Sequence, residues 1–400
     1  MADSESPARA PSERAPARTG EFSPLPLGSL SVWPPVVLAP MAGVTSFPFR
    51  RLCREFGAGL AVSEMITARG FREGNPTTLA LARGGPGERP RSVQVYGSDP
   101  TDVAPMVAAL VEDGVEHVDM NFGCPVPKVT RQGGGSAIPV RPRLLARLVR
   151  AAVGAAGAVP VTIKIRKGID DDLSTYLDSG RVAVEEGAAA IGLHGRTAAQ
   201  LYSGRSDRDA IARLVSAVSI PVLGNGDIWE WHDGLEMMRE TGCAGVIVGR
   251  GCLGRPWLFR ELAAAFEGER PPTPPAMGEI VPILLRHARG LVEFFGADAG
   301  MRQSRKWCAW YTKGFSGARA LRAELMRVST LAELAALLAR LDPAEPFPRA
   351  ALRTSRAKRG RTQRVRLPVG YLDDRDSDRP PRSPRGGVDL EAYERSLCGG

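Results

Sequence analysis

The stretch His117-Val118-Asp119-Met120-Asn121-Phe122-Gly123-Cys124-Pro125 reads as a short alternating strand that ends in a turn. Gly123 frees the backbone at the turn, and Pro125 stiffens it. The carboxamide of Asn121 can hold a polar ligand, and the thiol of Cys124 can give or take a proton. By themselves these residues fit a β-turn with a buried, inert cysteine better, since free cysteine is among the most buried residue types.

The same strand-then-turn pattern occurs eight times, and most of the strands are followed by helix-like sequence. The expected strands span residues 36–39, 60–63, 92–96, 117–120, 161–165, 190–193, 221–223 and 245–248. The expected helices between them span residues 49–55, 103–112, 142–152, 175–186, 209–217 and 229–240. Eight successive strand–helix units predict a (β/α)₈ TIM barrel. A doubly wound open sheet is the alternative, and it is weaker because the chain has no GxGxxG motif.

Composition sets the class of protein. Of 400 residues, 43% are apolar, which is enough for a large core, and no run approaches the roughly 18 apolar residues of a membrane span. The first residues are rich in Ala, Pro, Ser and Arg and lack the apolar segment of a secretory signal. Cysteines without CxxC spacing fit neither a zinc site nor a disulfide framework and predict a cytoplasmic protein with no metal. They are Cys53, Cys124, Cys243, Cys252, Cys308 and Cys398. The lack of a long apolar run predicts no membrane association.

The sequence divides into four segments. A disordered leader (1–24) precedes the barrel (25–268), and a proline-rich linker near 270–275 leads into a small all-helical domain (276–342). Its helices are expected at 279–295, 301–313, 318–328 and 331–341. The segment 343–400 is predicted to be a basic, mostly disordered tail. The net charge of the chain is +9, and residues 353–366 alone carry seven Lys and Arg and no acid. This basic run suggests a polyanion partner or a solvated tail, and the two are compatible.

Polar residues gather at the carboxyl ends of the predicted strands, the face that carries the active site in TIM barrels. Gly249-Arg250 and Asn225-Gly226-Asp227 follow the last two strands, where barrels often bind phosphate, although two tight turns would look the same. Lys164 lies within a strand and must either meet an anion or reach the rim. Gln94 can hydrogen-bond a flat heterocycle, and His194 ends its strand where it can touch phosphate or such a ring.

Six motifs in this order resemble the tRNA-dihydrouridine synthases, and the B-type branch of the bacterial enzymes is the best match. The resemblance runs from about residue 25 to about residue 339. The motifs are Ala39-Pro40-Met41-Ala42-Gly43-Val44-Thr45, Met120 to Pro125, Lys164-Ile165-Arg166-Lys167-Gly168, His194-Gly195-Arg196-Thr197, Asn225-Gly226-Asp227-Ile228, and Gly249-Arg250-Gly251 with Arg255-Pro256-Trp257.

The resemblance implies an FMN-binding barrel followed by a helical tRNA-binding domain, with Cys124 as the catalytic residue. It implies that FMN is bound by Pro40, Met41, Ala42, Gln94, Lys164, His194, Asn225, Gly226, Asp227, Gly249 and Arg250. It places Asn121, Arg196, Arg302, Arg305, Lys306 and Lys313 on the tRNA substrate, with Trp310 and Tyr311 on the same RNA-facing helix. The chain departs from the family in its glycine-rich loop, Gly133 to Gly135, and in its Arg-rich tail.

The reaction implied is reduction of the C5=C6 bond of uridine in tRNA by a monomeric enzyme. Hydride would pass from reduced FMN to C6 and a proton from Cys124 to C5, since a thiol with a pKa of about 8.5 is mostly protonated at neutral pH. NADPH or NADH would reduce the flavin. Two alternatives remain open: a flavin barrel that reduces a small-molecule pyrimidine, and a non-catalytic tRNA-binding protein. No short motif reports which uridine is modified.

Overall fold

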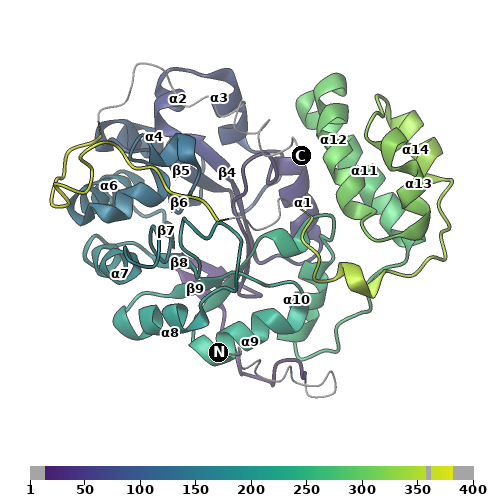
Figure 1. The fold of residues 1–400 in the computed structure, drawn as a ribbon, viewed down its shortest axis with the longest axis horizontal. Helices are drawn as coiled ribbons and strands as arrows, with labels where there is room; N and C mark the ends of the chain where they lie inside the picture. Colours follow the sequence, from purple (N-terminus) through teal and green to yellow (C-terminus); the bar gives the residue numbers. More distant parts are fainter. Residues whose placement is uncertain (1–13, 357–361, 382–400) are drawn as a thin grey trace.

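In the computed structural model, which describes residues 14–356 and 362–381, eight parallel strands form a closed barrel in the order β10-β3-β4-β5-β6-β7-β8-β9 (Figure 1). The predicted TIM barrel is therefore confirmed. Its strands are β3 (Val36–Leu38), β4 (Leu60–Thr67), β5 (Ser92–Tyr96), β6 (His117–Phe122), β7 (Val161–Arg166), β8 (Ala190–His194), β9 (Val222–Asn225) and β10 (Gly245–Val248).

Strand alternation decides which side chains enter the barrel. On β7, Ile163 and Ile165 are fully buried in the layer between strands and helices, whereas Lys164 points to the interior. Lys164 pairs in register with Asn121 of β6 and with Gly192 of β8. A Cβ on Gly192 would lie 3.5 Å from Lys164 Cγ and 2.7 Å from Ile247, so the glycine leaves room for the lysine.

A ring of helices covers the outer surface of the strands (Figure 1). The main helices of the ring are α1 (Phe47–Glu55), α4 (Pro100–Glu112), α6 (Pro142–Ala156), α7 (Tyr176–Glu185), α8 (Arg208–Ala217), α9 (Trp231–Thr241) and α10 (Leu258–Phe266). Shorter helices follow β4 and β6, namely α2 (Ala68–Arg72), α3 (Pro76–Arg83) and α5 (Pro127–Thr130). Because each parallel strand must return along the outside, the helices bury their apolar faces against the sheet.

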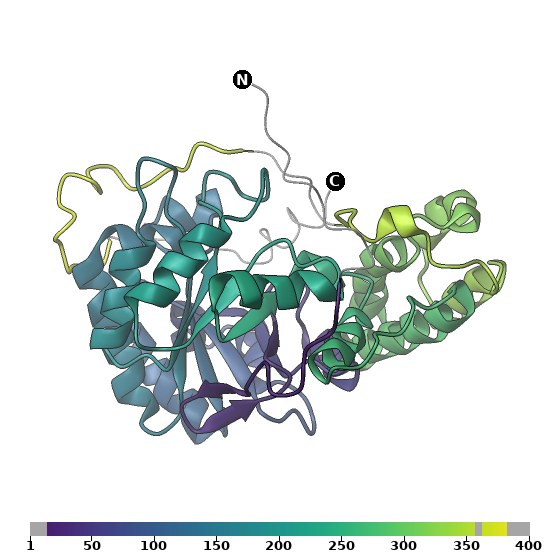
Figure 2. The ribbon, with the colours of Figure 1, turned by 90° about the horizontal axis from the view of Figure 1, so that it is seen from below.

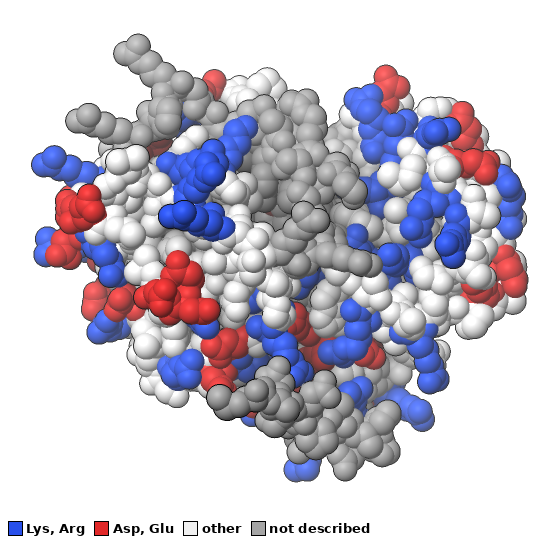
Figure 3. All heavy atoms as spheres, viewed as in Figure 1, with Lys and Arg blue, Asp and Glu red and all other residues white. Residues whose placement is uncertain are grey.

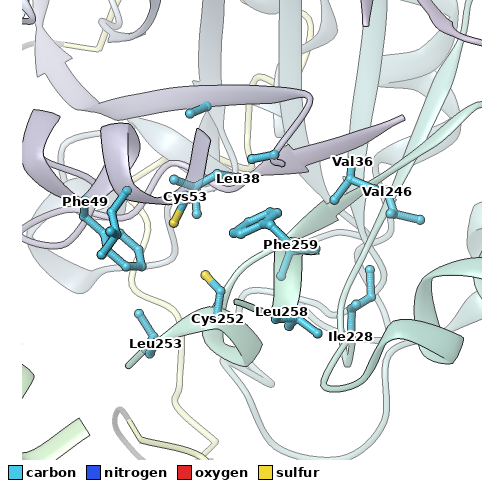
Figure 4. Close-up of a cluster of buried hydrophobic side chains, with 14 of the residues drawn as sticks. Val36, Leu38, Phe49, Cys53, Ile228, Val246, Cys252, Leu253, Leu258 and Phe259 are labelled. Carbon is cyan, nitrogen blue, oxygen red and sulfur yellow. The ribbon is translucent and has the colours of Figure 1, made fainter. Parts of the chain in front are cut away.

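One part of this layer closes the barrel between its first and last units. Phe49 and Cys53 on α1 face Cys252 and Phe259 across the apolar cluster drawn in Figure 4. All four side chains are fully buried. Both thiols lie in this apolar packing, where a free cysteine behaves as a small hydrophobic side chain.

An amino-terminal hairpin, which the sequence analysis did not predict, closes the other end of the barrel. Strands β1 (Leu25–Leu27) and β2 (Leu30–Val32) pair antiparallel and lie at the end of the barrel opposite the yellow carboxyl-terminal segment (Figure 2). Leu25 and Leu27 pack with Leu60 and Ile247 inside the barrel. The leader is also shorter than predicted, because Ala17 is buried and its N–H donates to the carbonyl of Ala265 at 2.8 Å. Residues 1–13 lie outside the described residues.

The helical domain contains α11 (Met277–Phe295), α12 (Ala297–Tyr311), α13 (Ser316–Leu325) and α14 (Leu331–Leu338). Aromatic rings join it to the barrel: between ring centroids, Phe49 of α1 lies 4.4 Å from Trp307 and 5.4 Å from His287. Burial lowers the pKa of His287 to about 3, so this imidazole is neutral at physiological pH. The aromatic part of the seam is therefore uncharged, and at its edge Arg286 of α11 pairs with Glu55 of α1 at 2.9 Å.

The segment predicted to be a disordered tail is ordered over much of its length, and this corrects the prediction. Phe347 is buried between Trp257 and Phe315, with ring centroids 5.9 and 5.6 Å away. Arg353 forms ion pairs with Glu230 at 2.8 Å and Asp233 at 3.0 Å. Composition did not predict that this segment is ordered, because the acidic partners of its basic residues are distant in the sequence.

Arg356 is 7% exposed and donates to the carbonyl of Trp310 at 3.0 Å, so it belongs to the packed part of the tail. Residues 362–381 also lie against the barrel, and Tyr371 is buried there. Residues 357–361 and 382–400 lie outside the described residues. No helix in the described part of the chain is both long enough and apolar enough to cross a membrane.

Candidate active site

A cavity of about 220 Å³ opens at the carboxyl ends of the barrel strands. Every residue that the sequence analysis assigned to FMN lines it: Pro40, Met41, Ala42, Gln94, Lys164, His194, Asn225, Gly226, Asp227, Gly249 and Arg250. Asn121 and Cys124 line it as well. Since these residues come from strands spread over the whole sequence, the barrel is what brings them to one place.

A chain of hydrogen bonds inside the barrel leads to the Cys124 loop (residues 123–134). Gln94 Nε2 donates to Asp119 Oδ2 at 2.7 Å, and Gln94 Oε1 accepts from Asn121 Nδ2 at 2.8 Å. Asn121 Oδ1 then accepts from the backbone N–H of Cys124 at 2.9 Å and of Gly123 at 3.2 Å. The amide of Asn121 therefore holds the turn that carries the thiol.

Arg166 and Gly135 hold the same turn from other sides. Arg166 Nε donates to the carbonyl of Gly123 at 3.0 Å. The carbonyl of Cys124 accepts from Ser136 N at 3.0 Å, and a Cβ on Gly135 would lie 2.5 Å from that carbonyl. Gly135 also has a φ of +54°, which favours glycine. The glycine-rich departure from the family pattern thus permits close packing behind Cys124.

Lys164 supplies a positive charge at the floor of the cavity. Its Nζ donates to Asn225 Oδ1 at 2.9 Å, and Asn225 Nδ2 donates to the carbonyl of Ile247 at 2.7 Å. Burial, with a smaller effect of Arg166, lowers the pKa of Lys164 to about 8, and Asp119 opposes this shift. Burial raises the pKa of Asp119 to about 6 against its hydrogen bonds from Thr162 and Gln94. At pH 7 the lysine is mostly a cation and the aspartate mostly an anion.

His194 lies beside these cations and is uncharged. Burial lowers its pKa well below the usual value, and the positive charges of Arg166 and Lys164 lower it further. The neutral imidazole can still donate one hydrogen bond and accept another. It therefore suits a polar heterocycle edge or a phosphate oxygen without adding charge.

The side of the cavity formed by β9 and β10 presents a second cation. Arg250 lies 3.6 Å from Asp227, with its guanidinium 4.3 Å from the ring centre of Tyr202 and 5.1 Å from that of Trp229. An arginine held between two aromatic rings keeps its forked donors oriented for an anion. This geometry agrees with the phosphate site expected after the last two strands.

Arg196 does not line this cavity, so the cavity geometry gives no support to its assignment to the substrate. It is 1% exposed, and its Nη2 donates to both carboxylate oxygens of Asp227, at 2.8 and 2.7 Å. It also donates to the carbonyls of Ser203 and Gly204. Its role is to orient Asp227 and the loop after β8.

The four basic residues assigned to tRNA in the helical domain also lie outside the cavity. Arg302 is exposed on α12, and Lys313 is half-buried beyond its end. Arg305 donates to the carbonyl of Val328 at 3.1 Å. Lys306 donates to the carbonyl of Gly43, whose N–H donates to the buried Glu64 at 2.8 Å. Lys306 thus joins the helical domain to the loop that carries Met41.

The sequence analysis did not identify two residues that form part of the site. Asp119 was read only as part of a strand, although its position two residues before Asn121 places both on the interior face. Tyr202 lies in a loop without any motif, and no sequence signal would have identified it. Trp310, expected to face RNA, reaches across from α12 to line the cavity.

One group in the described part of the chain has ligand atoms close enough for a metal ion. His232, Asp233 and Glu236 place such atoms within 4.8 Å of one another. Arg14 lies 3.0 Å from His232 Nε2, and Arg353 pairs with Asp233 at 3.0 Å. These arginines already supply positive charge, so the group is an ion-pair network that ties both ends of the described chain to α9.

Comparison with known proteins decides the family. The model of the dihydrouridine synthase family matches residues 37–351. The chain belongs to the dihydrouridine synthase family. Among its relatives, a probable tRNA-dihydrouridine synthase of Mycobacterium tuberculosis is 50% identical over 368 residues, covering 89% of this chain and 94% of the relative. The tRNA-dihydrouridine synthase B of Pseudomonas aeruginosa is 41% identical over 295 residues, covering 73% and 88% respectively.

The predicted family is therefore confirmed, with a B-type dihydrouridine synthase among the relatives. The family match ends at residue 351, which leaves the described residues 362–381 outside it. The alignment with the mycobacterial relative covers more of this chain than the alignment with the Pseudomonas protein.

Proposed function

We propose that this protein reduces specific uridines of tRNA to dihydrouridine, with FMN bound in the barrel cavity and NADPH or NADH as the reductant. The observation that carries the proposal is the position of Cys124. Its turn is held by Asn121, Arg166 and Gly135 at the mouth of a cavity lined by Lys164 and Arg250.

The residues present suit a flavin mononucleotide. Met41, Ala42 and Ile247 offer apolar surface for a flat ring system, while Gln94 and His194 offer hydrogen bonds to its edge. Arg250, together with the backbone of Gly249, would hold the phosphate. When bound, the flavin supplies hydride to C6 of the uracil ring.

The chain's own residues account for the remaining chemistry. Lys164 stabilises negative charge on a bound anion, because it is a cation below pH of about 8. Cys124 gives a proton to C5 of the uracil. Its fixed turn sets the face from which that proton comes. The uracil must leave its stack to reach the mouth, so the protein binds the nucleotide in an extruded conformation.

Replacement of Cys124 tests the proposal. Cys124→Ala is expected to retain FMN and its reduction by NADPH but to form no dihydrouridine in tRNA, measured by mass spectrometry of nucleosides. Cys124→Ser, which keeps a weaker acid at the same place, is the matched control and should retain a slow rate. Unchanged dihydrouridine formation in Cys124→Ala would remove the proton-donor role.

The two alternatives give different results in the same assays. Reduction of free uridine nucleotides as fast as tRNA would favour the small-molecule reading. A colourless protein that binds tRNA and is indifferent to Cys124→Ala would favour the non-catalytic one.

A further inference from the structure

A carboxyl-terminal strap (residues 362–381) crosses one side of the barrel, where it is drawn in yellow in Figure 1. Its first residues reach Pro125, which lines the cavity. Gln363 attaches it there: its Nε2 donates to the carbonyl of Pro125 at 2.7 Å and to that of Ala198 at 3.0 Å. Its backbone N–H donates to the carbonyl of Ala199 at 2.8 Å. Gln363 therefore bridges the Cys124 loop and the loop after β8.

The strap continues with a two-residue alternation. Val365 and Leu367 are half-buried and pack on a cluster that contains Ala137, Ile169 and Tyr371. Arg364 and Arg366, between them, are exposed. Since side chains alternate along an extended chain, the packing of one set fixes the outward direction of the other.

Tyr371 anchors the strap further along. It is 2% exposed, and the guanidinium of Arg141 lies 3.9 Å from its ring centre. Arg141 also donates to its carbonyl at 3.2 Å. The Cβ that Gly133 lacks would lie 3.0 Å from the Tyr371 ring, so the strap is seated directly on the glycine-rich part of the Cys124 loop.

The outward face of the strap is basic at its start, where Arg364 and Arg366 stand, whereas exposed aspartates follow from Asp373 onward. Gln363 is hydrogen-bonded to Pro125. Arg364 directly follows Gln363 in the sequence, and Cys124 directly precedes Pro125. Among residues 14–356 and 362–381, neither Arg364 nor Arg366 has an acidic ion-pair partner. Lys128 and Arg131, from the Cys124 loop itself, are also exposed. Figure 3 shows both basic and acidic side chains over the part of the barrel that the strap crosses in Figure 1.

We propose that Arg364 and Arg366 bind the phosphate backbone of the RNA next to the uridine that is reduced. This proposal rests on the proposed function, which brings an extruded nucleotide to Cys124. Because Gln363 contacts Pro125 beside Cys124, the phosphates that flank such a nucleotide would come within reach of the two arginines that follow Gln363. Arginine forks bind phosphate in bidentate fashion, and the contact is independent of sequence.

The test is tRNA binding by Arg364→Gln/Arg366→Gln at several salt concentrations. We expect the Kd for unmodified tRNA at low salt to rise about 10-fold, and the slope of log K against log salt to fall by about 1.5, as for two lost phosphate contacts. Reduction of the flavin by NADPH in the absence of RNA should be unchanged. The control is Arg89→Gln/Arg181→Gln, which removes the same charge from exposed positions that do not line the cavity, where the arginines pair with Glu116 and Asp178.

A double variant with the native Kd and salt slope would overturn the proposal, as would an equal loss in the control pair. Failure of the proposed function would look different, because the native protein would then bind tRNA without forming dihydrouridine. Arg364 and Arg366 are both exposed, so their replacement should not disturb the fold. An unchanged flavin content would show that the variant proteins are folded.

Discussion

Asp119 and Gln94 are joined by a hydrogen bond of 2.7 Å inside the barrel, and this bond orients the amide that holds the Cys124 turn. An ionised carboxylate can only accept, so Gln94 must present its Nε2 to Asp119 and its Oε1 to Asn121. Asn121 must then turn its own oxygen toward the N–H of Cys124. A buried acid thus sets the direction of hydrogen bonds that end at the proposed proton donor.

Asp119→Asn tests that direction. Asparagine keeps the shape but offers only one acceptor oxygen to Gln94 and Thr162, both of which donate to the native carboxylate. We expect uridine reduction in single turnover to slow by about 10-fold or more because the Cys124 turn loses its fixed position. Flavin content should be retained. A native single-turnover rate in Asp119→Asn would contradict the orienting role.

The charge of Lys164 should make flavin binding depend on pH. Its folded pKa of about 8 lies below the ordinary 10.5, so it is a cation below pH 8 and neutral above. We expect the affinity for FMN, measured by fluorescence quenching, to fall about 10-fold or more as pH rises through 8. In Lys164→Met the affinity should be lower and flat across this window; the same pH dependence in this variant would exclude Lys164 as the cause.

The lowered pKa of Lys164 also makes the free energy of unfolding depend on pH, in a direction that can be stated. Between pH 10.5 and about 8 the unfolded chain takes up a proton that the folded chain does not, so the contribution of Lys164 to the free energy of unfolding falls as pH drops through that window. Chemical denaturation of the flavin-free protein at pH 8 and 10, compared with Lys164→Met, measures it. An equal pH dependence in the variant would assign the effect to another group.

Gly135→Ala should impair catalysis without removing the cofactor. The added Cβ would lie 2.5 Å from the carbonyl of Cys124, at a φ of +54° that alanine resists. We expect dihydrouridine formation to drop about 100-fold, with flavin content near native. Gly154→Ala in α6, where a Cβ meets nothing within 4 Å, is the control and should be native in both assays.

Phe347→Ala measures how far the carboxyl-terminal segment stabilises the fold. The ring is buried between Trp257 and Phe315, so its removal should lower the free energy of unfolding by about 3 kcal/mol. The midpoint of denaturant unfolding reports the change. Val369→Ala, at a fully exposed position of the strap, should leave that midpoint unchanged. Equal midpoints for both variants would mean that residue 347 is not part of the core.

The sequence by itself determined the barrel, the family and the residues that line the cavity. Strand alternation and the Gly-rich turns are local properties, and in a (β/α)₈ barrel the carboxyl ends of all strands meet at one face. That rule sufficed to bring Gln94, Lys164 and Asn225 together. The motif around Cys124 likewise carried its proposed role before any geometry was known.

Only the tertiary structure decided what supports those residues. Arg196 turned out to orient Asp227, and Lys306 to hold the loop at Gly43, because their partners lie far away in the sequence. The tail read as disordered from its composition, yet Arg353 and Tyr371 are fixed by acidic and aromatic groups on distant helices and loops. Local composition reports the cost of ordering a segment, whereas the contacts that offset this cost exist only after the barrel has folded.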